Sequence, residues 1–196
     1  MSQLKINLMH STNACNYVLK TISKGGANWD QYQNPSSSWE TCIKTYGEAA
    51  CTAKKDSVDI CVYEKLRPSY RKALKKSSKS KLEKIRLMAD EIIKMKCGNC
   101  GEFSSLAFMY LYDKNVRPIE WMALIGADHA FVVIGRNKKS NINNALSWGA
   151  NAVICDPWGQ GFRKNKKTGT YPASNFDVNM ADLVSFSGVK SLYREE

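Results

Sequence analysis

Histidines are scarce in this sequence, and long apolar runs are missing. Only His10 and His129 occur among the 196 residues, so a mechanism that needs an imidazole has two candidates. No apolar run approaches the roughly 20 residues that span a bilayer. The N-terminal segment lacks the apolar core of about 7–15 residues found in secretory signals. We therefore expect either a cytoplasmic protein or one that leaves the cell by a route without a cleaved signal peptide.

The number of cysteines is odd, so they cannot all be paired in disulfides within the chain. The chain has seven cysteines, and an odd count without a secretory signal argues for reduced thiols rather than a disulfide framework. We expect most of them to be small, buried, apolar residues.

Acidic residues are outnumbered by basic ones. Lysine and arginine total 29 against 18 aspartates and glutamates, which gives a formal net charge of +11. A charge of this size attracts anionic membranes, acidic partners or nucleic acid, although lysine-rich faces can also serve solubility alone. The basic residues cluster in Arg71–Arg86 and Arg163–Lys167 without interleaved aromatic residues, so a base-stacking nucleic-acid surface is not expected.

The pattern of apolar residues predicts helices in the first half of the chain. Apolar spacings of three and four predict two helices. The first is capped by Ser11 and ends before Gly25. The second covers Lys81–Met95, and its inward residues are Leu82, Ile85, Met88, Ala89, Ile92 and Ile93. The segment Ser57–Leu66 fits a strand or a helix equally well. Pro68 is expected to break the pattern.

After Asp113 the apolar pattern changes to alternation. It predicts strands over Pro118–Ile125, His129–Gly135 and Ala152–Cys155, and a last helix over Val178–Phe186. Helices followed by strands are typical of an α+β fold rather than a βαβ fold. We expect one domain over residues 1–196, mainly helical over 1–95, with a central helix and an antiparallel sheet over 96–196.

The stretch at residues 97–112 stands out within this layout. A Cys-Gly-Asn-Cys turn precedes a largely apolar helix, so Cys100 lies at the helix N-terminus. Unpaired backbone N–H groups and the helix dipole there favour the thiolate form, which is the nucleophilic one. Alternatively, Cys100 is a buried thiol with a structural role only.

A cysteine nucleophile needs a general base and a group that orients that base. His129 opens one predicted strand, and Asp156 closes the next. If these strands pair as antiparallel neighbours, both residues lie at the same end of the sheet. Each has a structural alternative, a satisfied strand histidine and a turn aspartate before Pro157, but together they favour a Cys–His–Asp triad.

These residues carry a resemblance. The Cys-Gly-Asn-Cys-Gly-Glu segment from Cys97 resembles the nucleophile turn of papain-like enzymes. With Asp-His-Ala-Phe-Val-Val from Asp128 and Cys-Asp-Pro-Trp from Cys155, it more closely resembles papain-like toxin and effector domains of pathogenic bacteria. That group includes type III secreted effectors that are cysteine proteases or glutamine deamidases, and the deamidase domain of a mitogenic dermonecrotic toxin.

The resemblance implies a papain-like fold without cofactor or metal, a helical N-terminal lobe and a nucleophile helix packed on an antiparallel sheet. It implies that Cys100 is the nucleophile, His129 the general base and acid, and Asp156 the orienting acid. The oxyanion-hole glutamine of papain-type enzymes is missing from residues 93–96. Its role would fall to the Cys100 backbone N–H and a second donor, either Asn99 or a residue of the Asn28–Asn34 loop. The Arg136–Asn151 connection is long for this group and is a candidate substrate-contacting insertion.

The expected activity is that of a secreted bacterial effector or toxin acting on a host protein. The toxin-like motif and the chain length favour glutamine deamidation, and proteolysis or transglutamination use the same chemistry. Three other interpretations stay open: a redox pair of Cys97 and Cys100, a zinc site of Cys97, Cys100, His129 and Cys155, and an inactive papain-like binding module. Besides the protein substrate, the basic clusters suggest an anionic membrane or an acidic partner.

Overall fold

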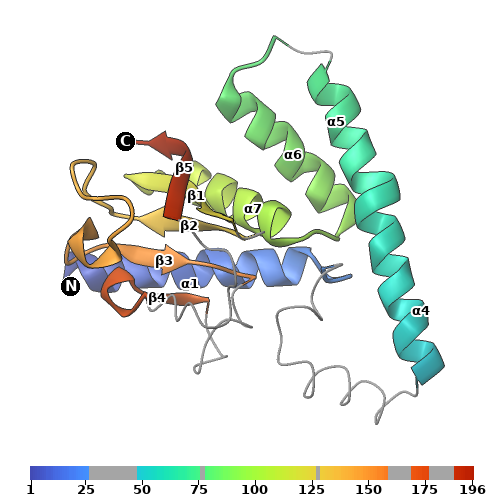
Figure 1. The fold of residues 1–196 in the computed structure, drawn as a ribbon, viewed down its shortest axis with the longest axis horizontal. Coiled ribbons are helices and arrows are strands. Elements are labelled where there is room, and N and C mark those ends of the chain that lie inside the picture. The colour runs from blue at the N-terminus through green and yellow to red at the C-terminus, as the bar shows by residue number, and fades with distance from the viewer. Residues whose placement is uncertain (27–47, 76–77, 127–128, 159–168, 177–187) are drawn as a thin grey trace.

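The computed structural model describes residues 1–26, 48–75, 78–126, 129–158, 169–176 and 188–196 (Figure 1). Helices come first and an antiparallel sheet follows, which confirms the predicted α+β class. The helices are α1 (Gln3–Thr21), α4 (Glu48–Asp59), the π-helix η1 (Ile60–Leu66), α5 (Arg67–Lys75), α6 (Lys81–Met95) and α7 (Cys100–Asp113). The strands are β1 (Ile119–Ile125), β2 (Ala130–Ile134), β3 (Val153–Cys155), β4 (Thr170–Pro172) and β5 (Gly188–Glu195).

The five strands form one sheet in the order β4-β3-β2-β1-β5, and every neighbouring pair is antiparallel. Alternate residues point to opposite faces of the sheet. Val132 and Ile134 of β2 face the main core, which contains the apolar sides of α1 and α7, whereas Phe131 and Val133 face a second core. Because both faces are covered, β2 is apolar along its whole length.

The second face is covered by the connection between β2 and β3. Trp148, in the 3₁₀ turn η2 (Ala145–Trp148), is fully buried in this core beside Phe131 and Ile154. This connection runs from the end of β2 to the start of β3, away from the end of the sheet that carries His129. The Arg136–Asn151 segment, which the sequence offers as a substrate-contacting insertion, thus helps to complete the second core at the end of the sheet opposite His129.

Helix α1 begins earlier than predicted. Its cap is Ser2, whose hydroxyl accepts a hydrogen bond from the Lys5 backbone N–H. Ser11, the predicted cap, is buried within the helix and donates from its hydroxyl to the Ile154 carbonyl oxygen at 3.1 Å. A polar residue that reads as a cap in the sequence is thus a docking contact between α1 and the sheet.

The ambiguous segment Ser57–Leu66 is helical, and Pro68 does not break the helix. Helices α4, η1 and α5 form one continuous rod (Figure 1). The Arg67 backbone N–H donates to the Val62 carbonyl oxygen, five residues back. A proline ring collides with the carbonyl four residues before it in a regular α-helix, and the wider π-turn just before Pro68 avoids that collision.

Helix α6 has the predicted bounds, and Ser80 and Glu83 form a capping box at its start. Ile85, Ala89 and Ile92 are buried as expected, with Leu82 and Met88 packed against them. The prediction that Ile93 points inward is wrong, because Ile93 is 40% exposed.

No helix among the described residues is long and apolar enough to cross a membrane. The helix expected over Val178–Phe186 lies outside the described residues.

The strands expected at β1, β2 and β3 are confirmed within a residue or two, while β4 and β5 were not expected. A buried ion cluster ties β5 to the sheet. The Glu120 carboxylate of β1 accepts from the Arg136 Nε at 2.6 Å and from the Arg194 Nη1 of β5 at 3.0 Å. Burial raises the pKa of Glu120, but the hydrogen bonds and charges of these partners outweigh it and the pKa is lowered.

Replacing Glu120 by glutamine is expected to lower the free energy of unfolding by about 3 kcal/mol, because two guanidinium groups lose their buried counter-charge. Since the folded-state pKa of Glu120 is below its ordinary value of 4.5, this contribution is present above that value and is lost as the pH falls through the folded-state pKa. Urea denaturation at pH 7 and pH 3 measures both effects. The control Asp113→Asn, at the exposed Arg86 pair, should cost less than about 1 kcal/mol. An equal loss in both variants would contradict the role of the cluster.

Candidate active site

The nucleophile candidate opens helix α7. Cys100 is its first residue, and Asn99 caps the helix in a reciprocal box with Glu102. The Asn99 backbone N–H donates to the Glu102 Oε2 at 2.9 Å. The first turn of α7 is therefore fixed by its own side chains, and Cys100 sits among the N–H groups at the positive end of the helix.

The turn before Cys100 is paired with another segment. Residues 24–26 run parallel to 96–98: the Lys24 N–H donates to the Lys96 carbonyl at 2.9 Å, and the Gly98 N–H donates to the Gly25 carbonyl at 3.2 Å. The Trp158 ring covers this contact. A Cβ at Gly26 would lie 2.0 Å from that ring, so glycine is required there for the ring to approach the backbone.

The turn is also held by a covalent bond. Cys97 forms a disulfide with Cys61 of η1, with Cα atoms 6.3 Å apart, and Cys51 is disulfide-bonded as well. The expectation that the cysteines are reduced is therefore wrong for these positions. The redox-pair and zinc interpretations both require a Cys97 thiol, and they are wrong for the same reason.

The rod α4-η1-α5 contacts the start of α7 at three further points. The Asn99 Nδ2 donates to the Tyr63 hydroxyl at 3.0 Å. The Arg67 guanidinium donates to both oxygens of the buried Glu102 carboxylate, at 2.9 and 3.3 Å, and the Tyr70 hydroxyl donates to Oε1 at 3.1 Å. Burial raises the pKa of Glu102, but Arg67, the Asn99 N–H and Tyr70 together lower it below its ordinary value.

The general-base candidate and its orienting acid lie at one end of the sheet. His129 precedes β2 and Asp156 follows β3, and these strands pair antiparallel with Val132 opposite Cys155. The Nε2 of His129 and the Oδ2 of Asp156 are 2.7 Å apart, and both side chains are buried. The Asp156 N–H donates to the Gly169 carbonyl at 2.6 Å, which extends the β3–β4 pairing and holds the aspartate in place.

The Cys100 side chain interacts with the same imidazole. Burial disfavours the charged ring, but the charge and hydrogen bond of Asp156 and the interaction with Cys100 outweigh it and raise the pKa of His129 to about 10. With Nε2 engaged by Asp156, Nδ1 is the nitrogen left for the thiol. Because the folded-state pKa exceeds the ordinary value of 6.5, the stability gained from the protonated ring is fully present below pH 6.5 and is lost as the pH rises through about 10.

The structure thus brings together Cys100, His129 and Asp156, the three residues selected from the sequence. Asn99 is adjacent, but its side chain caps α7 and contacts Tyr63, so it is occupied by holding the turn. The Asn28–Asn34 loop, the other suggested source of an oxyanion donor, lies outside the described residues.

Sequence reasoning missed the residues that hold the site from the rod and from the far side of the turn. These are Tyr63, Arg67, Tyr70 and Trp158, together with the Glu102 carboxylate that Arg67 and Tyr70 bind. The spacing of Glu102 three residues after Asn99 signals a capping box, but nothing in the sequence pairs Glu102 with an arginine 35 residues away. No family model matches the sequence, and no curated protein or solved structure matches it either.

Replacing Arg67 by alanine is expected to lower the free energy of unfolding by about 3 kcal/mol, because Glu102 is left buried and unpaired. The alkylation rate of Cys100 should fall in parallel as the first turn of α7 loosens. Arg71→Ala is the matched control, since Arg71 is an exposed arginine one turn further along the same helix. Urea denaturation and mass spectrometry of alkylated Cys100 measure the two effects, and equal behaviour of both variants would refute the role of Arg67.

Gly26→Ala is expected to destabilise the protein by about 1–3 kcal/mol, because the new methyl group collides with Trp158 and with the Gly98 carbonyl. Gly101→Ala provides the contrast: a Cβ there meets no heavy atom of the described residues within 4 Å, its own helical turn aside. This second change should be neutral or slightly stabilising. Thermal unfolding of the two variants side by side tests the contrast, which fails if Gly26→Ala is silent.

Proposed function

We propose that this chain is a papain-like cysteine hydrolase of the bacterial effector or toxin type, with Cys100 as nucleophile, His129 as general base and acid, and Asp156 as orienting acid. We further propose that it deamidates a glutamine side chain of a host protein. The observation that carries the proposal is the 2.7 Å contact between Asp156 and the Nε2 of His129, with Cys100 acting on the same ring from the start of α7.

The arrangement has the parts that thiol acylation requires. An imidazole with a raised pKa stays protonated at neutral pH and stabilises a neighbouring thiolate. Asp156 holds the ring through Nε2, which carries a proton toward the carboxylate, and Nδ1 is then the nitrogen that serves the sulfur. A histidine with a purely structural role would be satisfied by Asp156 alone. Here the ring also interacts with a cysteine at a helix N-terminus, which a structural role does not require.

The first half-reaction transfers the acyl group to the enzyme. The Cys100 sulfur attacks the carboxamide carbon, and the charge on the carbonyl oxygen is stabilised by the Cys100 backbone N–H at the start of α7. His129 then donates its Nδ1 proton to the departing nitrogen. The C–N bond breaks, ammonia leaves, and a thioester with Cys100 remains.

The second half-reaction releases the product. Water attacks the thioester carbon while His129 accepts one of its protons at Nδ1. The C–S bond breaks, the new carboxylic acid leaves and gives its remaining proton to the solvent, and the Cys100 thiolate and the protonated His129 are restored. An amine in place of water gives transglutamination, and a backbone amide in place of the side-chain amide gives proteolysis.

Burial of the site favours a side-chain amide as substrate. Only 4% of Cys100 is exposed, and His129 and Asp156 are similarly enclosed. A glutamine side chain is a slender group that reaches a recessed sulfur, whereas a scissile backbone needs room for the chain on both sides. Proteolysis remains the second candidate because the same triad performs it.

Cys100 is expected to be alkylated by iodoacetamide at pH 6 at least about tenfold faster than an ordinary thiol, because its thiolate is stabilised by the imidazole. Cys15 is a matched internal control, since it is also 4% exposed and its sulfur lies beside Cys155 and Thr170. Cys155 should react slowest, because its hydrogen bond with Cys15 and its burial raise its pKa. Site-by-site mass spectrometry gives the three rates in one sample.

Two variants test the source of the reactivity. His129→Ala should abolish the advantage of Cys100 over Cys15. Asp156→Asn removes the charge that raises the His129 pKa, so the advantage should shrink at pH 6 and persist in part at higher pH. If Cys100 reacts no faster than Cys15 in the unaltered protein, the catalytic proposal fails and an inactive binding module is the better description.

The reaction itself is distinguished by its products. With a glutamine-rich unfolded protein as substrate, a deamidase releases ammonia and leaves the chain length unchanged, whereas a protease creates new N-termini. Cys100→Ala must abolish either activity. If new N-termini form and no ammonia is released, the proposed activity is proteolysis and not deamidation.

A further inference from the structure

The larger of the two basic clusters of this chain lies in one segment, and the smaller one is Arg163–Lys167. Between Lys65 and Arg86 the sequence has ten lysines and arginines and one acidic residue, Glu83, a local charge of +9 out of the total +11. The remaining residues are therefore close to neutral. A general solubility role would distribute the charge over the surface, so the concentration requires a separate explanation.

Two of these cations are used within the protein. Arg67 binds Glu102, and Arg86 binds Asp113. Seven others are exposed, and none of the seven is in an ion pair with a described residue. One of them, Lys65, lies before Arg67 on the rod, and the other six lie beyond it. These six are the cationic tip: Arg71, Lys72, Lys75, Lys79, Lys81 and Lys84.

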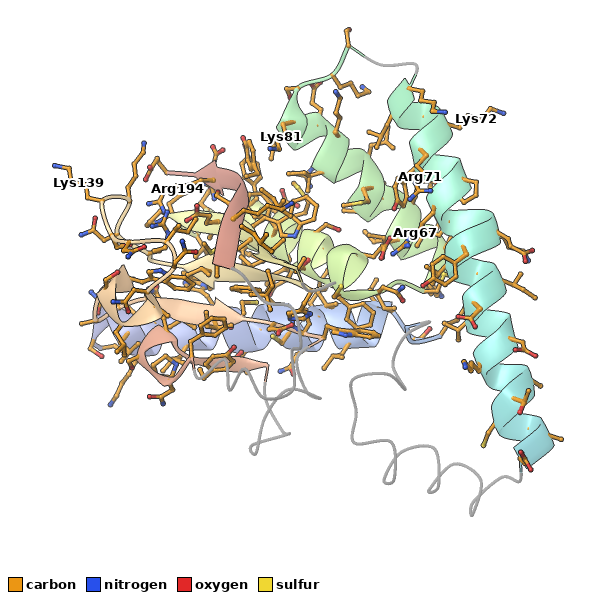
Figure 2. The ribbon with its side chains drawn as sticks, in the orientation of Figure 1. Arg67, Arg71, Lys72, Lys81, Lys139 and Arg194 are labelled. Carbon is orange, nitrogen blue, oxygen red and sulfur yellow. A yellow bond between two sulfur atoms is a disulfide. The ribbon has the colours of Figure 1, made fainter. Side chains whose placement is uncertain are left out.

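The cationic tip projects from the body of the molecule. It spans the C-terminal end of α5 and the N-terminal end of α6, which lie together at the end farthest from α1 (Figure 1). Lys72 and Lys81 lie on these two helices, and the Lys72 side chain points outward (Figure 2). The hairpin is held together by the Ser69 hydroxyl donating to Glu91 at 2.7 Å and by Leu74, Leu82 and Ile85 packing in the core.

The chemistry of the tip indicates what it binds. Five of its six cations are lysines, which act as hydrated point charges, whereas arginine is the residue used for bidentate pairing with a protein carboxylate. Protein interfaces depend on buried aromatic and arginine anchors, and single-stranded nucleic acid requires stacking aromatics. The one aromatic residue in the sequence between Arg67 and Arg86 is Tyr70, which is buried. Leu74 and Leu82 pack against the core between the two helices.

We propose that the cationic tip binds the surface of an anionic phospholipid bilayer. Clusters of four to eight basic residues on helices are attracted by the negative potential of such membranes within a Debye length. None of the large apolar side chains in residues 67–75 and 78–86 is exposed, so the contact is electrostatic and peripheral. Arg67 lies four residues before Arg71, the first cation of the tip, and eight before Lys75, about 6 Å and 12 Å along the helix at 1.5 Å per residue. A bilayer bound at the far end of the tip therefore leaves the start of α7 clear of the lipid.

Vesicle co-sedimentation tests the proposal on the full chain. The protein should bind vesicles of phosphatidylcholine with phosphatidylserine at low salt, and neither bind pure phosphatidylcholine nor remain bound at high ionic strength. The variant Lys72→Gln, Lys75→Gln, Lys79→Gln and Lys81→Gln should bind on the order of 100-fold more weakly. The control Lys5→Gln, Lys20→Gln, Lys139→Gln and Lys190→Gln removes the same charge from exposed positions elsewhere and should change binding less than about threefold.

Several outcomes would overturn the proposal. Equal losses in the tip variant and the control would mean that net charge alone drives binding. Binding that persists in high salt, or binding to uncharged vesicles, would exclude an electrostatic contact. Duplex DNA that binds more tightly than the vesicles would assign the tip to nucleic acid. Alkylation of Cys100 should be unchanged in both variants, so the failure of membrane binding and the failure of the catalytic proposal are separable.

Discussion

The start of helix α7 depends on the interactions of one buried carboxylate, that of Glu102. A charge removed from water is tolerated only when partners replace its hydration. Glu102 obtains them from the Asn99 N–H, from Arg67 and from Tyr70. Two of these three partners belong to another helix, so α7 can bury its first turn only when the rod α4-η1-α5 is docked against it. The position of Cys100 is therefore a consequence of tertiary structure rather than of the local turn alone.

The other half of the site depends on strand pairing. The backbone N–H of Asp156 is bonded to Gly169 and its carboxylate to His129, so the residue after β3 is held from both neighbouring strands. A change of register by one residue between β2 and β3 would separate the imidazole from the carboxylate and turn the apolar residues of β2 to the wrong face. Packing of the two cores on either side of β2 thus also fixes the geometry of the histidine.

Much of this arrangement could be predicted from the sequence because it follows from local rules. The bounds of α6 follow from its apolar stripe, and the meeting of His129 and Asp156 follows from two adjacent antiparallel strands. The continuation of the helix through Pro68 could not be predicted, because a π-turn leaves no mark in the residue pattern. Strand β5 does not alternate, because its pairing with β1 shifts register at Leu192 and two adjacent residues, Lys190 and Ser191, are exposed. It is held by the ion cluster at Glu120 and by Tyr193, which packs against the main core.

The cysteines illustrate a different limit. An odd count argues against disulfides only if every cysteine has the same role. Here Cys97 is used to anchor the turn and Cys100, three residues later, remains a thiol. A chain that keeps some cysteines as free thiols can carry an odd number and still form disulfides. Cys61 and Cys97 are 36 residues apart in the sequence. They can pair only because the rod that carries Cys61 docks beside the start of α7, and the spacing of the cysteines does not reveal that docking.

One helical rod links the two proposals. Tyr63, Arg67 and Tyr70 are spaced by four and three residues, so they share the face of the rod that meets α7. Lys72 and Lys75 follow on the same rod toward its free end. On this arrangement, a bilayer bound at the tip would hold the rod, and the rod would hold the first turn of α7 through Glu102 and the Cys61–Cys97 disulfide. Cys100 would then be kept at a fixed height above the lipid, and the accessible glutamines would be those of proteins at that surface.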